Sequence, residues 1–254
     1  MNTKAKKVVT GIVVTFLLLL AGAAVWFFQF TKNGYILTVP YRSYFEQIAE
    51  NVYVNKDNAM SKDEILNLIH EAEDRDRDFY GELTYASDTT IILNDNEKIQ
   101  PKLGGGKDTY TFLFPKKHDY TCLSNEYFNL DIVAHEITHT ELHARLTKEA
   151  RSAIPIWFDE GLATQNDYRE RYSLESWIEK TDNGKNVPAL EDIDEPREFH
   201  CEEESERQFH YVIAKHEVGL WMEAHHREGL MDLIDRLNKG EDFNNVCKRY
   251  IILR

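Results

Sequence analysis

The sequence predicts an α+β fold in which a few strands precede a series of helices, behind a long apolar segment at the N-terminus. Three observations support this class: β-rich runs between residues 89 and 123, helical periodicity from residue 130 to about residue 237, and an apolar run over 8–30. Strands grouped before helices are typical of α+β proteins. No repeat of about 20 to 50 residues is visible, which excludes solenoids and propellers.

The composition is that of an ordinary globular protein, with 42% hydrophobic and 29% charged residues. Beyond the apolar segment about 220 residues remain, enough for one large domain or for two small, intimately packed ones. The formal net charge is −14, and the only charges before residue 32 are three lysines. The remainder is therefore more acidic still and repels phosphate backbones, which excludes nucleic acid as a partner. No two cysteines have the CxxC spacing of a thiolate metal site: they are Cys122, Cys201 and Cys247.

The apolar run over 8–30 is long enough to span a membrane. As a helix it measures roughly 34 Å, against a hydrocarbon core of about 30 Å. It is preceded by three lysines, Lys4, Lys6 and Lys7. The positive-inside rule therefore predicts a cytoplasmic tail over 1–7 and an exported domain over 31–254, periplasmic or extracellular.

Two alternatives for this run are a cleaved signal peptide and a buried core helix. A signal peptidase could use Ala21-Gly22-Ala23 as its small-residue site, but the apolar part of a signal peptide is usually only about 7 to 15 residues long, and this run continues through Trp26 and Phe28. A core helix that is apolar on every face over some 23 residues is unusual. The run favours an uncleaved, single-pass anchor in the cell membrane.

The first half of the remaining chain reads mainly as strands with one helix. Residues 35–39 are β-rich and end at Pro40, which predicts a strand. Ser61 and Glu64 form a capping-box pattern that predicts a helix over 62–79. Further strands are expected over 89–93, 109–114 and 120–123.

A loop between two of these strands contains Gly104-Gly105-Gly106 followed by Lys107. The pattern departs from the phosphate-binding GxxxxGK[ST] motif, because Asp108 stands where serine or threonine should be. A flexible hairpin loop is therefore favoured over a nucleotide site.

The second half is mostly helical. One helix is expected over 130–146, and Pro155 suits the first turn of another. Helical patterns return over 204–225 and 229–237, and Gly240 ends the last of them.

A metal-binding pattern, HExxH, occupies residues 135–139. His135 and His139 are four residues apart, so on a helix they project from one face, about 6 Å apart along the axis, and can reach one ion. Glu136 can approach a water molecule on that ion without coordinating it, and zinc lowers the pKa of such a water to about 7. A surface helix with a fortuitous HExxH is the alternative, but the helix is expected to be partly buried by its apolar residues, Val133, Ala134 and Ile137.

Catalytic zinc generally has three protein ligands and an open position. His143 lies eight residues after the first histidine, about 12 Å along a straight helix, which is too far for shared chelation. The HExxHxxGxxH pattern is absent, because Leu142 and Arg145 replace its glycine and third histidine. Two adjacent carboxylates remain as candidates, Asp159 and Glu160, which point about 100° apart on a helix.

The stretch WFDEGLA at 157–163, together with HExxH, resembles the gluzincin zinc metallopeptidases. It is similar to the segment that carries the ligand glutamate in the aminopeptidase N family and in small peptidase MA-like proteins, and the resemblance covers roughly 109–245. It implies a zincin-like metallopeptidase domain over 31–254 with a catalytic core at about 109–245. It also implies that His135, His139 and Glu160 are the three ligands of Zn²⁺. Glu136 is then the catalytic general base.

Two further features of the resemblance concern the substrate. No Gly-x-Met-Glu-Asn segment precedes the HExxH, and the missing grip on a substrate N-terminus favours an endopeptidase over an aminopeptidase. Gluzincins also use a tyrosine or histidine to donate a hydrogen bond to the oxyanion, for which Tyr211 is the first candidate and His210 the second. The alternative, that both residues only pack against or solvate their helix, is slightly favoured. A strand over 109–115 is expected beside the active-site helix, where an extended substrate could pair with it.

These observations predict a membrane-anchored, zinc-dependent hydrolase that cleaves peptide bonds in a peptide or protein substrate. Two other classes stay open. A catalytically idle metal-binding sensor or scaffold would bind stoichiometric zinc without turnover. A helical interaction module with a fortuitous HExxH would bind no zinc.

Overall fold

The computed structural model describes residues 3–104, 110–112 and 118–247. They group into two compact units. The first, which we call the sheet unit, comprises the described residues of Met1–Ala59, Ile91–Phe112 and Tyr120–Tyr127. The second, the helical unit, comprises those of Met60–Thr90, Leu113–Asp119 and Phe128–Arg254.

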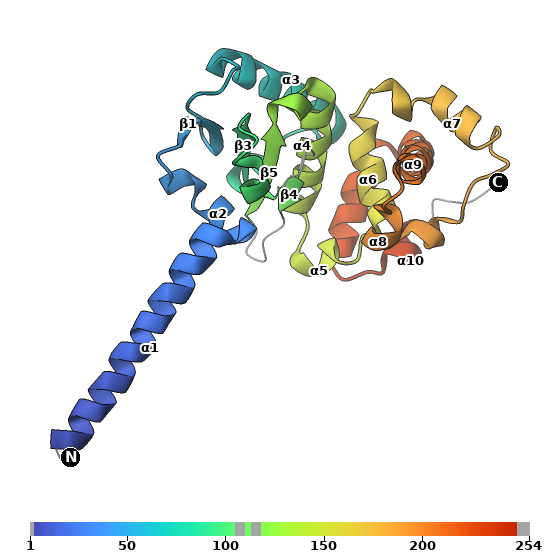
Figure 1. The fold of residues 1–254 in the computed structure, drawn as a ribbon. Coiled ribbons are helices and arrows are strands. Elements are labelled where there is room, and N and C mark those ends of the chain that lie inside the picture. The colour runs from blue at the N-terminus through green and yellow to red at the C-terminus, as the bar shows by residue number, and fades with distance from the viewer. Residues whose placement is uncertain (1–2, 105–109, 113–117, 248–254) are drawn as a thin grey trace. The chain divides into compact units, whose positions relative to one another are not determined.

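The predicted α+β class is confirmed, since the described residues form a small mixed sheet and many helices (Figure 1). The strands are β1 (Phe45–Ala49), β2 (Val52–Asn55), β3 (Thr89–Asn94), β4 (Tyr110–Phe112) and β5 (Asp119–Ser124). The helices are α1 (Thr3–Phe30), α2 (Lys32–Leu37), α3 (Lys62–Tyr80), α4 (Leu130–Arg145), α5 (Lys148–Arg151), α6 (Ile156–Gln165), α7 (Leu174–Lys180), α8 (Pro196–Phe199), α9 (Glu204–Asn238) and α10 (Phe243–Cys247).

The apolar N-terminal run forms the helix α1, drawn in blue in Figure 1. Its segment Val9–Phe30 is long and apolar enough to cross a membrane. The rest of the described chain buries none of this segment. A helix that exposes apolar side chains all round needs an apolar surrounding, and this fits a membrane span better than a core helix.

The strand predicted over 35–39 is wrong. These residues belong to α2 and to a 3₁₀ turn over Val39–Tyr41. Thr31 caps α2 by accepting a hydrogen bond of 3.1 Å from the backbone N–H of Gly34. Tyr35 and Ile36, which would face opposite sides of a strand, are both buried here. Local capping and packing therefore override the β propensity of this stretch.

The sheet has the order β1-β2-β3-β5-β4. Strands β1 and β2 form an antiparallel hairpin that the sequence did not predict, and β2 runs parallel to β3. The strands expected over 89–93 and 120–123 are confirmed as β3 and β5. The strand expected over 109–114 is present at Tyr110–Phe112, an edge strand antiparallel to β5. Residues 109, 113 and 114, and the loop at 105–107, lie outside the described residues.

In the helical unit, the predicted boundaries of α3 and α4 hold closely. The capping box is present, with Glu64 Oε2 accepting from the Ser61 backbone N–H at 2.8 Å and Ser61 Oγ accepting from the Glu64 N–H at 3.3 Å. Asn129 caps α4 by accepting from the Ile132 N–H at 3.1 Å. Each cap satisfies a donor that the first helical turn leaves without a partner.

Helices α6 and α9 pack closely around Gly161. A Cβ atom at this position would lie 2.5 Å from the carbonyl oxygen of Ala214 and 2.6 Å from a methyl carbon of Val218. The glycine of the WFDEGLA stretch is therefore needed for the close approach of the two helices. Fully buried neighbours such as Phe158 and Leu162 fill the core beside it.

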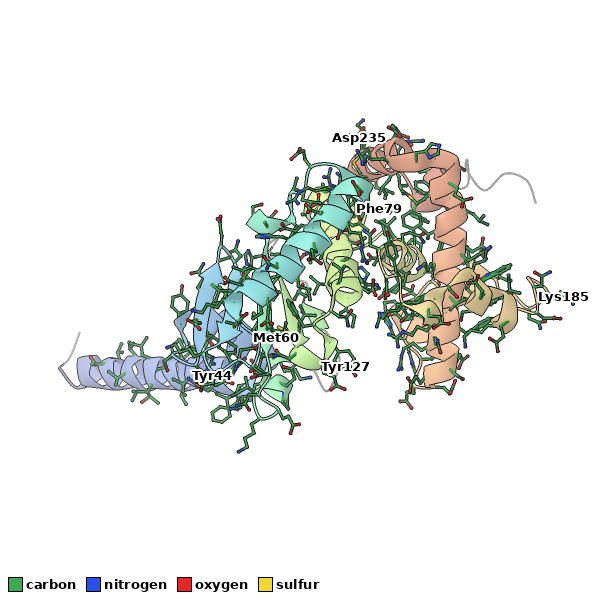
Figure 2. The ribbon with its side chains drawn as sticks, turned by 90° about the horizontal axis from the view of Figure 1, so that it is seen from above. Tyr44, Met60, Phe79, Tyr127, Lys185 and Asp235 are labelled. Carbon is green, nitrogen blue, oxygen red and sulfur yellow. The ribbon has the colours of Figure 1, made fainter. Side chains whose placement is uncertain are left out.

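The two helical patterns predicted over 204–225 and 229–237 form α9, which breaks at His226. There φ is 57° and ψ is −167°, a backbone conformation that is rare for residues other than glycine. The break places Arg227 at the C-terminal end of α3, where its Nε donates to the Phe79 carbonyl at 3.2 Å. Figure 2 shows α3 running from Met60 toward the labelled Phe79. Gly240, at φ 82°, ends the helical stretch as predicted.

Candidate metal centre

The centre begins with two histidines of α4. His135 and His139 lie one turn apart, and both are buried in the helical unit. Their ring centroids are 4.8 Å apart, and the two Nε2 atoms face each other at 3.1 Å. Two ring nitrogens at this distance repel each other if both present lone pairs, so a proton or a metal cation is needed between them.

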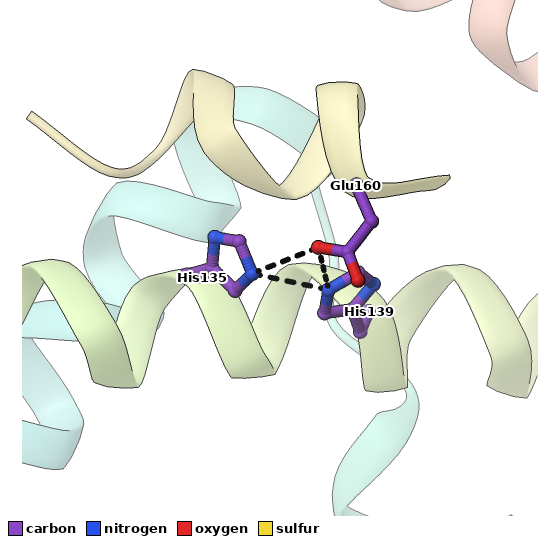
Figure 3. A group of neighbouring side chains, drawn as sticks. All are labelled: His135, His139 and Glu160. Atoms are coloured by element: carbon purple, nitrogen blue, oxygen red, sulfur yellow. Dashed lines mark hydrogen bonds and ion pairs between the residues drawn. The ribbon is translucent and has the colours of Figure 1, made fainter. Parts of the chain in front are cut away.

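Glu160 of α6 completes the group. Its Oε2 atom lies 3.4 Å from His135 Nε2 and 3.3 Å from His139 Nε2 (Figure 3). The side chain is buried, and Oε2 accepts no hydrogen bond from the described residues. A carboxylate oxygen that is buried without a donor needs a positive charge close by.

The geometry of the three residues fits a metal ion. Ligand atoms about 2.0 to 2.1 Å from a tetrahedral zinc ion lie about 3.3 Å from one another, close to the separations seen here. Two imidazoles and one carboxylate suit a transition metal such as zinc better than magnesium or calcium, which prefer oxygen ligands. The buried group of His135, His139 and Glu160 could therefore hold a metal ion.

Asp159, the neighbouring carboxylate, lies on the far side of the His139 ring. Its Oδ1 is 2.7 Å from His139 Nδ1, and its Oδ2 is 3.0 Å from His143 Nε2. Burial alone would raise the pKa of Asp159, but the two imidazoles hold it below its ordinary value. Asp159 thus orients His139 and leaves its Nε2 directed at Glu160, as carboxylates commonly do for metal-binding histidines.

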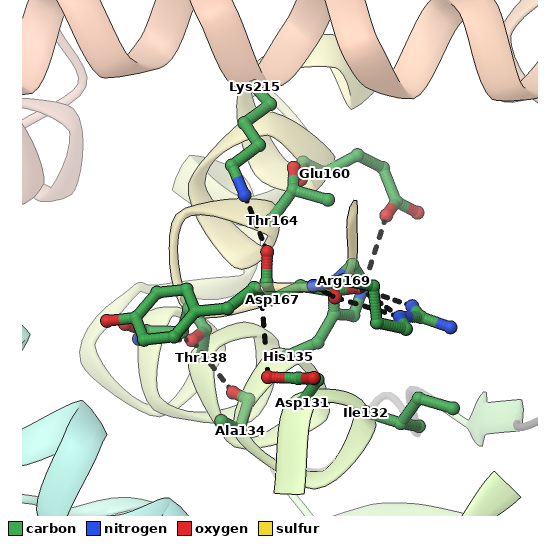
Figure 4. Close-up of polar contacts among 12 residues, drawn as sticks. Asp131, Ile132, Ala134, His135, Thr138, Glu160, Thr164, Asp167, Arg169 and Lys215 are labelled. Atoms are coloured by element: carbon green, nitrogen blue, oxygen red, sulfur yellow. Dashed lines mark hydrogen bonds and ion pairs between the residues drawn. The ribbon is translucent and has the colours of Figure 1, made fainter. Parts of the chain in front are cut away.

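Asp167 lies beside His135 as Asp159 lies beside His139, but its carboxylate is farther from the imidazole. Its Oδ2 lies 3.9 Å from His135 Nδ1. Arg169 donates to both carboxylate oxygens through Nε, at 2.8 and 3.0 Å, and Lys215 donates to the Asp167 backbone carbonyl at 2.5 Å (Figure 4). The fully buried Asp167 is therefore compensated by two cations while it faces the histidine.

Beneath the site, a buried polar network joins α3 to α4. Asp76 accepts hydrogen bonds from Thr138 at 2.7 Å and from the side-chain amide of Asn166 at 2.9 Å. Tyr80 donates to the Thr138 carbonyl at 3.0 Å. Burial, together with the charge of Glu141, raises the pKa of Asp76 to about 8 against the opposing effect of these hydrogen bonds. The network holds the central turn of α4, between the two histidines.

Glu136 and Tyr211 lie beside the three convergent residues. Glu136 follows His135 on α4 and is half-buried. The Tyr211 ring, on α9, is centred 6.4 Å from that of His135. Burial raises the pKa of Tyr211 well above its ordinary value, and the carboxylates of Glu160 and Glu136 raise it further. His210 points elsewhere, because its Nδ1 is 3.0 Å from the Phe199 carbonyl.

His200 is a site residue that the sequence analysis missed. It follows α8, and its Nε2 lies 3.3 Å from Glu160 Oε1, the carboxylate oxygen that does not face both histidines. In the sequence it is an isolated histidine in an acidic stretch, forty residues after Glu160. No spacing rule connects such a residue to the HExxH, so only the fold could reveal it.

Comparison with known protein families and with curated proteins finds no match to this chain. The interpretation of the site therefore rests on its own residues and geometry.

Proposed function

We propose that this protein is a membrane-anchored, zinc-dependent peptidase of the gluzincin type with a zincin-like catalytic domain. The observation that carries the proposal is the convergence of His135, His139 and Glu160 next to Glu136. A metal site with two imidazoles, one carboxylate and an acid one residue from the first histidine is the arrangement that HExxH hydrolases require.

In this proposal His135, His139 and Glu160 hold the metal, and Asp159 orients the imidazole of His139. A zinc ion bound there would supply Lewis acidity, which polarises the peptide carbonyl and acidifies water. Glu136 takes the proton from the attacking water and delivers it to the departing amine, so that one carboxylate acts first as base and then as acid.

Tyr211 is proposed to stabilise the oxyanion of the tetrahedral intermediate. Burial and the neighbouring carboxylates raise the pKa of Tyr211, so its hydroxyl keeps its proton at neutral pH and can donate a hydrogen bond. A donor already in place where negative charge develops lowers the barrier to the reaction. His210 is the weaker candidate, since its ring is bound to a backbone carbonyl.

The cellular setting of the proposal follows from α1. The segment Val9–Phe30 anchors the protein in the cell membrane, the lysines that precede it keep residues 1–7 in the cytoplasm, and the catalytic domain faces the periplasm or the exterior. The substrate is a peptide or protein at that side of the membrane. Without a Gly-x-Met-Glu-Asn segment, internal peptide bonds are the favoured target.

A metal analysis combined with one substitution tests the proposal. Full-length protein purified in detergent should contain about one zinc per chain by atomic emission and should cleave an unfolded protein. Glu136→Gln should keep the zinc and lose most of the activity, by a factor of roughly 100 or more. Glu149→Gln, which removes an exposed acid on α5, is the matched control and should change neither quantity.

The same experiment distinguishes the peptidase from a metal-binding sensor or scaffold and from an interaction module. Stoichiometric zinc without turnover in the unsubstituted protein would select the sensor or scaffold. An absence of bound metal after reconstitution would select the interaction module. Stoichiometric iron in place of zinc would point to different chemistry at the same ligands.

A further inference from the structure

A pocket of about 950 Å³ opens beside the metal centre within the helical unit. It reaches Asp159 and His143, and Asp159 is the residue whose carboxylate is 2.7 Å from His139 Nδ1. One imidazole ring therefore separates the pocket from the proposed metal position. Its volume is in the range of pockets that enclose ligands of drug or short-peptide size.

About half of the surface that lines this pocket is apolar. The walls come from the first turn of α6, the segment before it, the chain between α7 and α8, and the start of α10. The large apolar side chains in the lining include those of Ile154, Ile156, Trp157, Val187, Leu190 and Phe243. Such walls bind the hydrocarbon part of a side chain and exclude water from it.

The same lining carries strong negative charge. Four of its carboxylates form no ion pair with any described residue: Glu191, Asp194, Glu195 and Asp242. Within the described lining, the one permanent cation is Arg151, whose guanidinium already contacts Asp119 at 3.3 Å and the His143 carbonyl at 2.8 Å. The local field in the pocket therefore favours a positively charged ligand.

An apolar wall with a negative rim fits a long aliphatic side chain that ends in a cation. Lysine and arginine have this construction, since their methylene stems pack on apolar surface while the charged group stays near carboxylates and water. A glutamate or aspartate side chain would meet repulsion here, and a purely aliphatic one would leave the carboxylates without a partner.

We propose that this acid-rimmed pocket binds a lysine or arginine side chain of the substrate and directs the enzyme to cationic peptides. The inference rests on the proposed function and specifies its substrate class. The pocket holds the basic residue one imidazole ring away from the metal centre, so the residue lies close in sequence to the bond that is cleaved.

Peptide binding can be measured without turnover in the full-length Glu136→Gln variant. Five fluorescent octapeptides, identical except for one central residue, carry arginine, lysine, citrulline, norleucine or glutamate at that position, and fluorescence anisotropy gives each dissociation constant. Citrulline preserves the shape of arginine without its charge. We expect the arginine and lysine peptides to bind about tenfold more tightly than the citrulline peptide, with a preference that weakens as salt is raised.

A double substitution locates the preference on the pocket. Glu191→Gln with Asp194→Asn should weaken binding of the arginine peptide about fivefold, because each exposed charge pair contributes only modestly to binding. Binding of the citrulline peptide should not change. The control is Glu198→Gln with Glu202→Gln, which removes the same charge from exposed acids outside the lining and should leave both constants unchanged.

Equal binding of the arginine and citrulline peptides would overturn the proposal, as would an equal loss in the control pair. Tighter binding of the glutamate peptide would show that Arg151 governs the pocket and would overturn it too. These results differ from a failure of the proposed function. Selective arginine binding without hydrolysis by the unsubstituted protein would refute the peptidase and keep the pocket, and hydrolysis without a basic preference would do the reverse.

Discussion

Two adjacent carboxylates show how strongly position decides a residue's part in the site. Asp159 and Glu160 are covalent neighbours on α6, yet they approach His139 from opposite sides of its ring. Glu160 faces Nε2 and the point where the histidines converge, whereas Asp159 faces Nδ1. The angle of about 100° between successive helical side chains produces this difference. One carboxylate is thus suited to a metal and the other to orienting its ligand.

The contact between His200 and Glu160 leads to a testable prediction. This contact, with Glu160 Oε1, leaves Oε2 directed at the two histidines, so His200 should act as a positioning residue for the proposed ligand. We expect His200→Ala to weaken zinc binding about tenfold, in the range seen when outer partners of metal ligands are removed. Competition with a fluorescent chelator measures the affinity directly.

Two further variants serve as controls for the zinc affinity of His200→Ala. His200→Gln retains a hydrogen-bond donor and should restore part of the affinity. His70→Ala removes an exposed histidine from α3 and should have no effect. An unchanged zinc affinity in His200→Ala would show that the contact with Glu160 does not position the ligand.

The packing of whole elements sets where Glu160 can lie. Helix α6 approaches α9 through Gly161, the residue directly after Glu160. Helix α4 is held from below by α3 through Asp76, Tyr80 and Thr138. The candidate metal centre therefore lies between helices that are each fixed by a separate contact.

Gly161→Ala should destabilise the protein, because the added methyl would lie 2.5 Å from a backbone oxygen of α9. Overpacking of this kind costs about 1 to 3 kcal/mol. Gly219→Ala is the control, since its Cβ would meet only the flexible end of Gln165 at 3.3 Å and alanine favours helices. Thermal unfolding should show a lower melting temperature for the first variant and an equal or higher one for the second.

Asp76 should make stability depend on pH. Its pKa is about 8 in the folded protein against an ordinary value of 3.8, so the folded state holds a proton that the unfolded state releases. The stability contribution is full below about pH 4 and falls by about 1.4 kcal/mol per pH unit up to about pH 8. Asp76→Asn keeps the polar side chain and removes this titration.

The measurement is chemical denaturation of Asp76→Asn and the unsubstituted protein at pH 5 and pH 8. The free energy of unfolding of the variant should increase relative to that of the unsubstituted protein as the pH rises. Because both proteins are compared at the same pH, the contributions of the other titrating groups cancel. Asp74→Asn, on the same helix but exposed, should show no such trend. A difference that is constant with pH would mean that Asp76 is ionised in the folded protein.

For the whole molecule, the N-terminal helix bears on whether the protein is associated with a membrane. The described residues form a sheet unit, which includes α1, and a helical unit, which holds the metal centre. The segment Val9–Phe30 of α1 is apolar and follows three lysines, while the rest of the chain is strongly acidic. Acidic residues give no electrostatic attraction to anionic lipid, so we expect the proposed attachment to a membrane to depend on α1.

Fractionation and reporter fusions test the topology. The protein should stay with membranes after carbonate or high-salt washing, because burial of the apolar helix does not depend on charge. A reporter that is active only outside the membrane should be active when fused after Arg254. Release of a mature chain that begins near Val25 would instead identify Ala21-Gly22-Ala23 as a cleavage site and make the protein secreted.

Features that depend on local periodicity and spacing could be predicted from the residues alone. The boundaries of α3 and α4, strands β3 and β5, the apolar helix α1 and the pairing of His135 with His139 all follow from residues within a few turns of one another. The sequence did not predict α2 or the β1–β2 hairpin, because short segments with mixed propensity take their structure from their neighbours.

The residues that complete the site are distant in sequence, and they are brought together by the packing of the folded chain. The sequence resemblance singled out Glu160, but its distance from the two histidines depends on how closely α6 packs against α4 and α9. The placement of His200 beside Glu160, and the gathering of four carboxylates around an apolar pocket, have no sequence signal. These contacts join residues far apart along the chain, so they arise from packing of the buried helix faces and not from local patterns.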